Sequence, residues 1–552
     1  MSRHTWDLPW HEYLATLKDH ERPAMPGSPA TPDHTLPYRL AYLLVGVLVA
    51  VTGSLGSAMV MANTQLLAGG LGVSLAEASW LPVAFMMTNA CMNLLLVKFR
   101  MQYGLRLFAQ IFLIAFVGIS LISIFYSDYQ TTLILRGVAG MVSAAMSSLG
   151  ILYLVQAFPA KHRLKGLVLG MGLTSLGIPF TRVFTSRLLE ISEWQGFHTM
   201  ELGLAILSLV AVFSLRTPPS ERMKVYEKLD FLTFALFAPG IALLCAVLAI
   251  GRSVWWFDTA WVGWALIGSI VLLATALTIE YNRKRPLINL HFLSGSALIR
   301  LFLSVLLVRI VMAEQTAGIT GAMQQLGIGL DMMHTMFVVI LLATACGVVF
   351  SALTINPTKL HKPIALSLGL MAIGAFMDSR LTTQSYPAQL FFSQSLLAFA
   401  SGMFLGPAMI SGIVQVFQKG THNLVSFIVL FALSNNIAGL AGQSFVLTLQ
   451  AVRTRYHQIH LAEGMLAGNP NIELRLKQLS AAYGSVIGDS SVRTAEGYAL
   501  LQQQINLQAN ILAYNDAFFV VALIAAAGCI WTTIHHFRTR PPATPPAPPA
   551  RS

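Results

Sequence analysis

Few ionisable residues fall inside the long apolar stretches of this chain, and Glu314 is the most informative of them. It lies within the apolar stretch 299-321, with Arg309 before it and the polar side chains of Gln315 and Thr316 directly after it. A charged side chain at the centre of a bilayer costs roughly 2.5 to 3.5 kcal/mol on insertion scales, so such a residue is a candidate functional group. We therefore interpret Glu314 as a proton-binding carboxyl. The alternative is a structural ion pair of Glu314 with Arg309 or Arg136.

Amide side chains form a second group of candidates, because they can hydrogen-bond a bound compound inside an apolar cavity. The candidates are Asn63, Gln65, Asn89, Asn93, Gln315, Gln389 and Gln394. Buried amides that bridge helices explain the same pattern equally well. Asp378 and Asp516 fall at predicted outer helix ends, where water is available, and we expect Asp378 to be an interface residue.

No motif predicts catalysis, a cofactor or a metal site. The chain has no Gly-x-x-x-x-Gly-Lys-Ser/Thr, no His-Glu-x-x-His and no Gly-x-Ser-x-Gly sequence. Its four cysteines are scattered without Cys-x-x-Cys spacing, which predicts neither a disulfide nor a metal site. We expect a protein that is not an enzyme and that needs no cofactor.

The composition places these residues in a membrane. Of the 552 residues, 55% are hydrophobic and 11% are charged, against roughly 25% charged in a typical soluble domain. Apolar stretches of about 18 to 28 residues recur along the chain, each long enough to cross the hydrocarbon core as a helix. We count 14 spans, which predicts an all-α integral membrane protein. Their approximate bounds are 40-65, 78-97, 105-127, 130-157, 166-189, 198-215, 231-251, 260-280, 299-321, 332-355, 362-379, 388-413, 423-449 and 514-534.

The basic residues indicate how the spans are oriented. Clusters such as 161-165 and 283-285 alternate with outer loops that carry few lysines or arginines. This asymmetry places both termini in the cytoplasm by the positive-inside rule. It also explains the net charge of +12 without any nucleic-acid partner.

The spans divide the chain into five segments. A cytoplasmic arm (1-39) precedes six helices (40-215), a central two-helix insertion with its linkers (216-298), six more helices (299-534) and a disordered Pro-rich tail (535-552). A long outer loop (451-513) lies inside the last helical segment. Its apolar residues follow a 3.6-residue period, which predicts an amphipathic pair of outer helices.

Four motifs together resemble those of one family. Leu133 to Gly140 carries an Arg-x-x-x-Gly pattern, and Phe158-Pro159 opens an inner loop. Arg285 to Leu290 is similar to the entry into a second half, Leu71 to Trp80 resembles a first outer loop, and Gln508 to Phe518 looks like the start of a last helix. In this order they resemble the 14-helix drug:proton antiporters of the EmrB/QacA type in the major facilitator superfamily.

The resemblance implies the major facilitator fold, with two six-helix bundles, two central extra helices and a substrate cavity between the bundles. It implies that Arg136 faces this cavity and holds either a proton-relay partner or an anionic group; bracing two helices is the alternative. The residues that it associates with gating are Gly104, Arg106, Gly140, Gly177 and Pro179. The family usually has an acidic residue in helix one, at about Gly56, and this chain has none there.

The expected function is therefore proton-coupled efflux of small, largely hydrophobic toxic compounds across the inner membrane. In the EmrB branch such permeases work with a periplasmic membrane-fusion adaptor and an outer-membrane channel, and the loop 451-513 fits such partners. Two alternatives stay open. One is an exporter of a specific aromatic or anionic metabolite, with Arg136 and Arg309 as counter-charges, and the other is a transporter-derived sensor or scaffold that no longer pumps.

Overall fold

The computed structural model describes residues 10-23, 28-126, 128-283, 286-287, 289, 295-419, 423-463 and 470-539. These residues are almost entirely helical, as expected for a chain that must satisfy its backbone hydrogen bonds inside a bilayer. The Pro-rich tail from 540 to 552 lies outside the described residues.

The first half of the molecule is a bundle that follows a short arm. The arm contains α1 (Trp10–Ala15) and η2 (Asp19–Glu21). The bundle contains α2 (Leu36–Ala62), α3 (Thr64–Leu71), α4 (Leu75–Ala78), α5 (Trp80–Tyr103), α6 (Leu105–Phe125), α7 (Tyr129–Ala157), η3 (Ala160–His162), α8 (Arg163–Leu173), η4 (Thr174–Leu176) and α9 (Gly177–Ser214).

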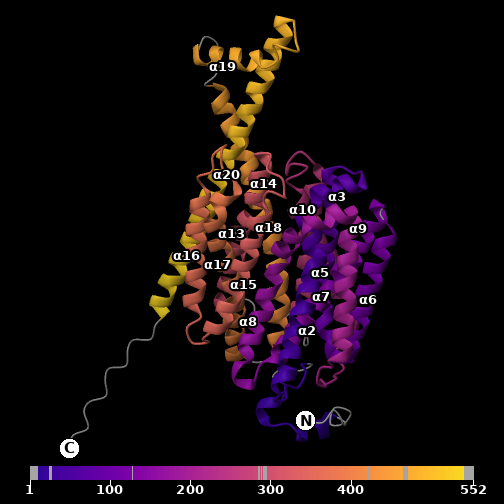
Figure 1. The fold of residues 1–552 in the computed structure, drawn as a ribbon. Helices are drawn as coiled ribbons and strands as arrows, with labels where there is room; N and C mark the ends of the chain where they lie inside the picture. Colours follow the sequence, from indigo (N-terminus) through magenta and orange to yellow (C-terminus); the bar gives the residue numbers. More distant parts are fainter. Residues whose placement is uncertain are drawn as a thin grey trace, which may run out of the picture.

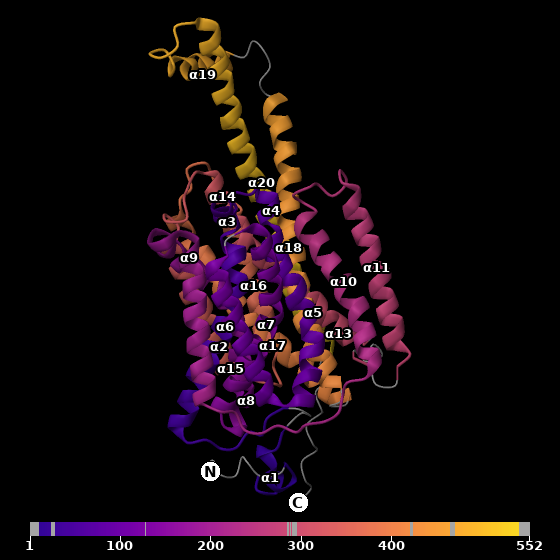
Figure 2. The ribbon, with the colours of Figure 1, turned by 90° about the vertical axis from the view of Figure 1, so that its right-hand side faces the viewer.

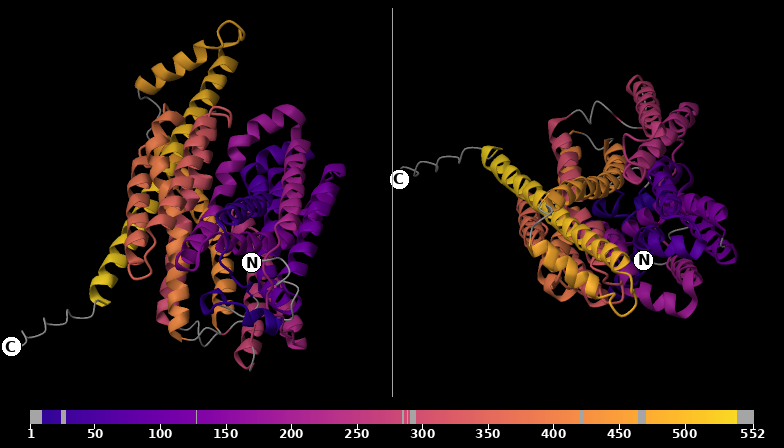
Figure 3. Two further views of the ribbon diagram at one scale, coloured as in Figure 1. Left: turned by 60° about the horizontal axis from the view of Figure 1, so that its bottom comes forward. Right: turned by 90° about the horizontal axis from the view of Figure 1, so that it is seen from above.

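The second half follows two intervening helices, α10 (Lys228–Ile250) and α11 (Ala260–Tyr281). It contains α13 (Ser296–Ala313), η5 (Glu314–Gly318), α14 (Ile319–Gln325), α15 (His334–Thr354), α16 (His361–Asp378), η6 (Pro387–Leu390), α17 (Phe391–Lys419), α18 (Leu424–Glu463), α19 (Pro470–Ala481) and α20 (Ser490–Thr539). The two halves stand side by side, and α20 runs the full height of the second (Figures 1 and 3).

Twelve helices of the described chain are long and apolar enough to cross a membrane, so the count of 14 is not confirmed. The two expected spans outside this set are 299-321 and 362-379. The first is interrupted, because α13 ends at Ala313 and a π-helical turn, η5, follows it. The second forms α16, an 18-residue helix that packs between α17 and α20 and whose mean hydropathy is lowered by His361 and Lys362 at one end and Asp378 at the other.

The helices α10 and α11 form a pair beside the junction of the two halves (Figure 2). The helix α10 packs on α5 of the first half and on α18 of the second. A buried charge network anchors the pair, because Asp230 accepts hydrogen bonds from Lys98 and Arg283 at 2.8 Å each. Arg283 also contacts Glu280 at 2.7 Å, so this central pair is tied to the first half by compensated charges.

Two helices extend far beyond the bundle at the end opposite α1 (Figure 2). The helix α18 has 40 residues and α20 has 50, about 60 Å and 75 Å at 1.5 Å per residue, against roughly 30 Å for a hydrocarbon core. We call residues 451-463 and 470-513 the projecting hairpin. Side chains join α18 and α20 within the hairpin and at its base: Gln458 donates to Asn506 at 3.1 Å, and Arg453 donates to Asp516, just outside the hairpin, at 2.6 Å.

Gly140 lets α7 approach α5 closely, and we predict a large cost for filling this position. A Cβ atom at Gly140 would lie 2.2 Å from the Phe85 carbonyl oxygen and 2.2 Å from Thr88 Oγ1. Gly140→Ala should therefore destabilise the protein by about 1 to 3 kcal/mol, seen as a lower thermal unfolding temperature. Gly118→Ala is the matched control, because its Cβ would meet no atom within 4 Å. Equal stability of the two variants would contradict this account.

Candidate functional site

A cavity of about 380 Å³ lies between the two halves of the molecule. The first half contributes residues of α2, α5, α7 and α8, and the second half contributes residues of α13, α17 and α18. Most of its wall is apolar or carries small hydroxyl groups. Asn89 and Asn93, two of the predicted cavity residues, lie in the wall. Asn89 accepts a hydrogen bond from Asn436 of α18 at 3.0 Å, so this amide pair joins the two halves.

The charged side chains in the cavity wall are all arginines. They are Arg100 of α5, Arg163 of α8 and Arg309 of α13, and no carboxylate belongs to the wall among the described residues. Arg309 donates through Nε to the Asn435 side chain at 2.6 Å. Arg100 is 9% exposed and donates to the Ser148 hydroxyl at 3.2 Å. The electrostatic character of the cavity is therefore positive.

The N-terminal arm, meaning residues 10-23 and 28-35, covers the end of the cavity nearest the termini. Ser28, Pro29 and Thr31 form part of the cavity wall. Arg163 holds the arm by donating to the carbonyl oxygens of His20 and Thr31 at 2.6 and 2.7 Å. Gln156 adds a hydrogen bond to the Ala30 carbonyl at 2.7 Å. The arm is thus docked on α7 and α8.

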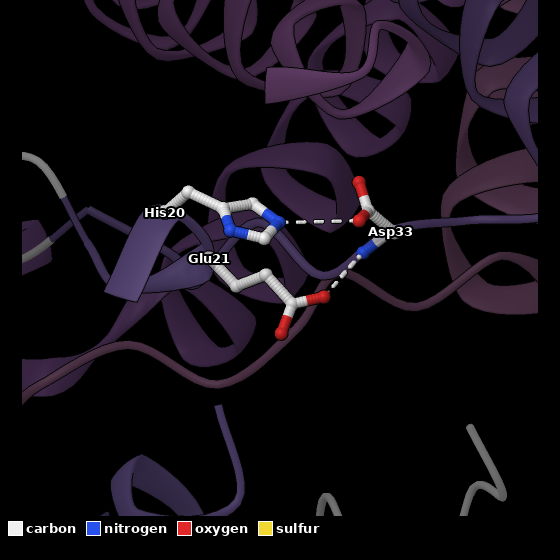
Figure 4. Close-up of side chains that lie close together, drawn as sticks. All are labelled: His20, Glu21 and Asp33. Carbon is white, nitrogen blue, oxygen red and sulfur yellow. Dashed lines mark hydrogen bonds and ion pairs between the residues drawn. The ribbon is translucent and has the colours of Figure 1, made fainter. Parts of the chain in front are cut away.

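His20, Glu21 and Asp33 come together inside the arm (Figure 4). His20 contacts Asp33 at 3.2 Å, and this hydrogen bond lowers the pKa of the Asp33 carboxyl. The Glu21 carboxylate accepts the backbone N–H groups of Lys18 and Asp33 at 2.9 Å each. These three groups offer ligand types that a divalent cation uses. Their hydrogen bonds already account for the arrangement, which folds the arm back on itself.

We predict that Arg163→Ala frees the arm and opens the cavity to reagents. The variant loses two hydrogen bonds from a charged donor, each worth about 1.5 to 3 kcal/mol. Labelling of a cysteine placed at Ser57, a cavity-wall position, should accelerate by about tenfold or more in a background without native cysteines. Lys359→Ala, which removes an exposed charge, is the control. An unchanged labelling rate would show that the arm does not limit access.

Glu314 lies in the π-helical turn η5 and is fully buried. Its carboxyl is not part of the cavity wall, whereas its neighbours Ala313 and Thr316 are. The structure forms neither of the anticipated ion pairs of Glu314, with Arg309 or with Arg136, among the described residues. Instead, Glu314 faces the second-half helices α16 and α17, where its charged neighbour is another acid, Asp378.

Asp378 is fully buried, so the expectation of a hydrated interface residue is wrong. Gln394 of α17 joins the two acids, because its amide donates to Asp378 at 2.8 Å and to Glu314 at 3.3 Å. Ser393 also donates to Asp378. Two buried carboxyls that share a site repel each other when both are negatively charged, and a proton on one of them removes this repulsion. The sequence does not predict this pair, because Asp378 is the last residue of its helix and an acid at a helix end is expected to be hydrated.

Arg136 is also buried, but it belongs to a separate cluster in the first half. It donates to Glu201 of α9 at 3.4 Å and contacts His198 at 3.2 Å. Arg136 is not in the described cavity wall. A Cβ atom at Gly56 would lie 3.5 Å from the Glu201 carboxylate. Glu201, which lies in the predicted span 198-215, is therefore next to Gly56. Gly56 is the position at which the drug:proton antiporters that this sequence resembles usually have an acidic residue.

Arg182 joins the two halves on the side of the cavity away from the termini. Its guanidinium donates to the Thr320 hydroxyl and to the Thr316 carbonyl at 2.6 Å each. It also lies 5.1 Å from the centre of the Phe337 ring. Because Thr316 is two residues from Glu314, this contact connects the interface of the halves to the acid pair.

The remaining predicted site residues have other positions. Gln315 donates to Gln394 within the second half, and Gln65 and Gln389 are exposed. Asn63 is buried at the end of α2 and donates to its own helix.

Among the motif residues, Gly177 lies in the cavity wall, Gly104 has a positive φ of 84° between α5 and α6, and Pro179 lies in the first turn of α9. Arg106 is exposed.

This arrangement of two helical bundles around a central cavity defines a membrane transporter fold. The chain matches the Major Facilitator Superfamily over residues 43–443 and belongs to that family. It is 23% identical over 514 residues to the uncharacterized MFS-type transporter YhcA of Bacillus subtilis (strain 168), a match that covers 89% of this chain and 91% of the relative.

Solved structures of the same family share the fold. The human organic anion transporter MFSD10 (TETRAN) is similar with a TM-score of 0.52 at 13% identity, covering 89% of this chain and 100% of that chain. The proton:xylose symporter XylE from E. coli also gives a TM-score of 0.52 at 13% identity, covering 89% of this chain and 95% of that one. At this identity the likeness concerns the fold alone.

Proposed function

We propose that this transporter is a proton-coupled exporter of small amphiphilic compounds, of the 14-helix drug:proton antiporter type. The buried pair of Glu314 and Asp378 is the observation that carries the proposal. A pair of neighbouring carboxyls bridged by the Gln394 amide can bind and release a proton as its access to water changes. The pair lies directly behind the cavity wall, since Ala313 and Thr316 flank Glu314 and line the cavity.

The proposed cycle couples the acid pair to movement of the two halves. Protonation from the side of the projecting hairpin neutralises Glu314, and this change alters the η5 turn to which Arg182 is bonded. Release of Arg182 lets the halves separate on that side, so the bound compound leaves. Deprotonation toward the other side resets the transporter, as alternating access requires.

Export across an inner membrane with both termini in the cytoplasm fits the distribution of basic residues. The projecting hairpin then lies in the periplasm, where it is available to a membrane-fusion adaptor that connects to an outer-membrane channel. Its exposed apolar side chains Val452, Tyr456 and Ile459 on α18 and Tyr498 on α20 are available to such a partner.

Proteoliposomes test the proposal directly. Substrate-dependent proton movement is expected for at least one compound in a panel of hydrophobic cations, uncouplers and aromatic acids. Transport of a compound without proton movement would reject proton-coupled export and indicate facilitated diffusion. Absence of transport for every compound, with protein shown to be folded, would favour a sensor or scaffold.

A further inference from the structure

Arg100 and Arg309 in the cavity wall differ in their partners from the buried Arg136 and Arg283. Arg182 also bonds only neutral groups, but it lies outside the cavity wall and joins the two halves. Arg136 lies 3.4 Å from Glu201, and Arg283 contacts three carboxylates at 2.7 to 2.8 Å. Arg100 and Arg309 have no carboxylate partner among the described residues and bond only the neutral side chains of Ser148 and Asn435. The Nε atom of Arg100 is buried and has no hydrogen-bond partner among the described residues.

A desolvated guanidinium without a counter-charge is costly, so the wall of this cavity calls for an anion. Arg163 is not a candidate for binding this anion, because its guanidinium donates to carbonyl oxygens of the N-terminal arm. Asp and Glu are missing from the described wall, so a bound cation would find no carboxylate counter-charge there. Arg100 and Arg309 are therefore the groups that would meet the charge of a bound compound.

We propose that Arg309 and Arg100 are an anion-binding site, and that the transported compound carries a carboxylate or sulfonate on an apolar body. Arg309 lies near the end of α13 in the second half, Arg100 lies in the last turn of α5 in the first half, and both belong to the cavity wall. The two halves thus each present one cation to the same space. A guanidinium binds such an oxyanion through two parallel hydrogen bonds, while the apolar wall covers the rest of the compound.

This site names the substrate class of the proposed exporter and rests on that function for its physiological use. Binding can be measured without transport, which separates the two. We suggest equilibrium binding to purified protein in nanodiscs with three probes of the same ring system: naphthalene-2-sulfonate, naphthalene-2-methanol and trimethyl(naphthalen-2-yl)ammonium. The wild-type protein should bind the sulfonate about tenfold more tightly than the ammonium probe.

Variants locate the site. Arg309→Gln and Arg100→Gln should each weaken sulfonate binding by about tenfold to a hundredfold, as expected for the loss of a hydrogen bond to a charged group. Arg309→Lys should retain part of the affinity because the charge remains. Lys359→Gln, which removes an exposed charge outside the cavity wall, should bind like the wild type.

Two results would overturn the site: equal affinity for all three probes, or an anion preference that persists in a folded Arg100→Gln/Arg309→Gln double variant. Failure of the proposed function has a different signature. In that case the sulfonate still binds through the two arginines, but no proton movement accompanies its transport. Proton movement driven only by the ammonium probe would support the exporter and reject the anion site.

Discussion

Glu314→Gln is expected to abolish substrate-driven proton flux while the protein remains folded and still binds its substrate. Glutamine keeps the shape of the side chain and its hydrogen bond with Gln394, but it cannot bind and release a proton. Because Glu314 is outside the cavity wall, substrate affinity should change little. We expect proton flux in proteoliposomes to fall to the level of protein-free vesicles, at least about a hundredfold, as for loss of an essential proton-transfer group.

Asp378→Asn is the companion experiment, because Asp378 shares Gln394 with Glu314. If the two acids act as a pair, either single variant and the double variant should have the same phenotype. Asp331→Asn, which neutralises an exposed acid in the loop between α14 and α15, is the control and should couple normally. Wild-type proton flux in Glu314→Gln would exclude the pair as the coupling site.

Glu201→Ala is expected to have the largest effect on stability. It leaves Arg136, which is 3% exposed, without the carboxylate that compensates its charge. Removing one partner of a buried ion pair costs about 3 to 5 kcal/mol. We expect a large fall in the thermal unfolding temperature and in the yield of monodisperse protein. The double variant Arg136→Leu/Glu201→Leu should recover part of this loss, because no isolated charge remains.

A half-exposed ion pair provides the comparison for this experiment. Arg453 and Asp516 are each 35% exposed, and His457 contacts the same carboxylate at 2.7 Å. Because these groups are open to solvent, Asp516→Ala should cost less than about 1 kcal/mol. Proton flux in the double variant Arg136→Leu/Glu201→Leu then separates two roles. Normal flux would assign this cluster to stability alone, whereas lost flux in folded protein would make it a second proton site beside the position of Gly56.

Much of the architecture follows from the sequence, because hydrophobic length is a local property. A run of about 20 apolar residues forms a helix wherever the chain is placed in a bilayer, since its backbone has no other way to form hydrogen bonds. The expected helices 40-65, 78-97 and 130-157 correspond closely to α2, α5 and α7. The span 299-321 shows the limit of this reasoning, because the π-helical turn at Glu314 depends on packing that hydropathy does not record.

The sequence predicts only some residues of the candidate site. Glu314 was found because its cost in a bilayer is independent of its partners. Glu201 satisfies the same criterion within the predicted span 198-215, and a uniform search of the spans for acids would have found it. Asp378 could not be found by this rule, because its position at a helix end suggests hydration, and only the packing of α16 against α17 and α20 buries it.

The sequence by itself determined that this chain is a helical membrane protein, which of its residues are costly in a bilayer, and that its 3.6-residue pattern continues into residues 451-513. Those properties depend on the length, polarity and period of single segments. The tertiary structure alone decided which charges meet. It pairs Glu314 with Asp378 and Arg136 with Glu201, and it leaves Arg100 and Arg309 facing one cavity, because contacts between distant segments depend on how whole helices pack.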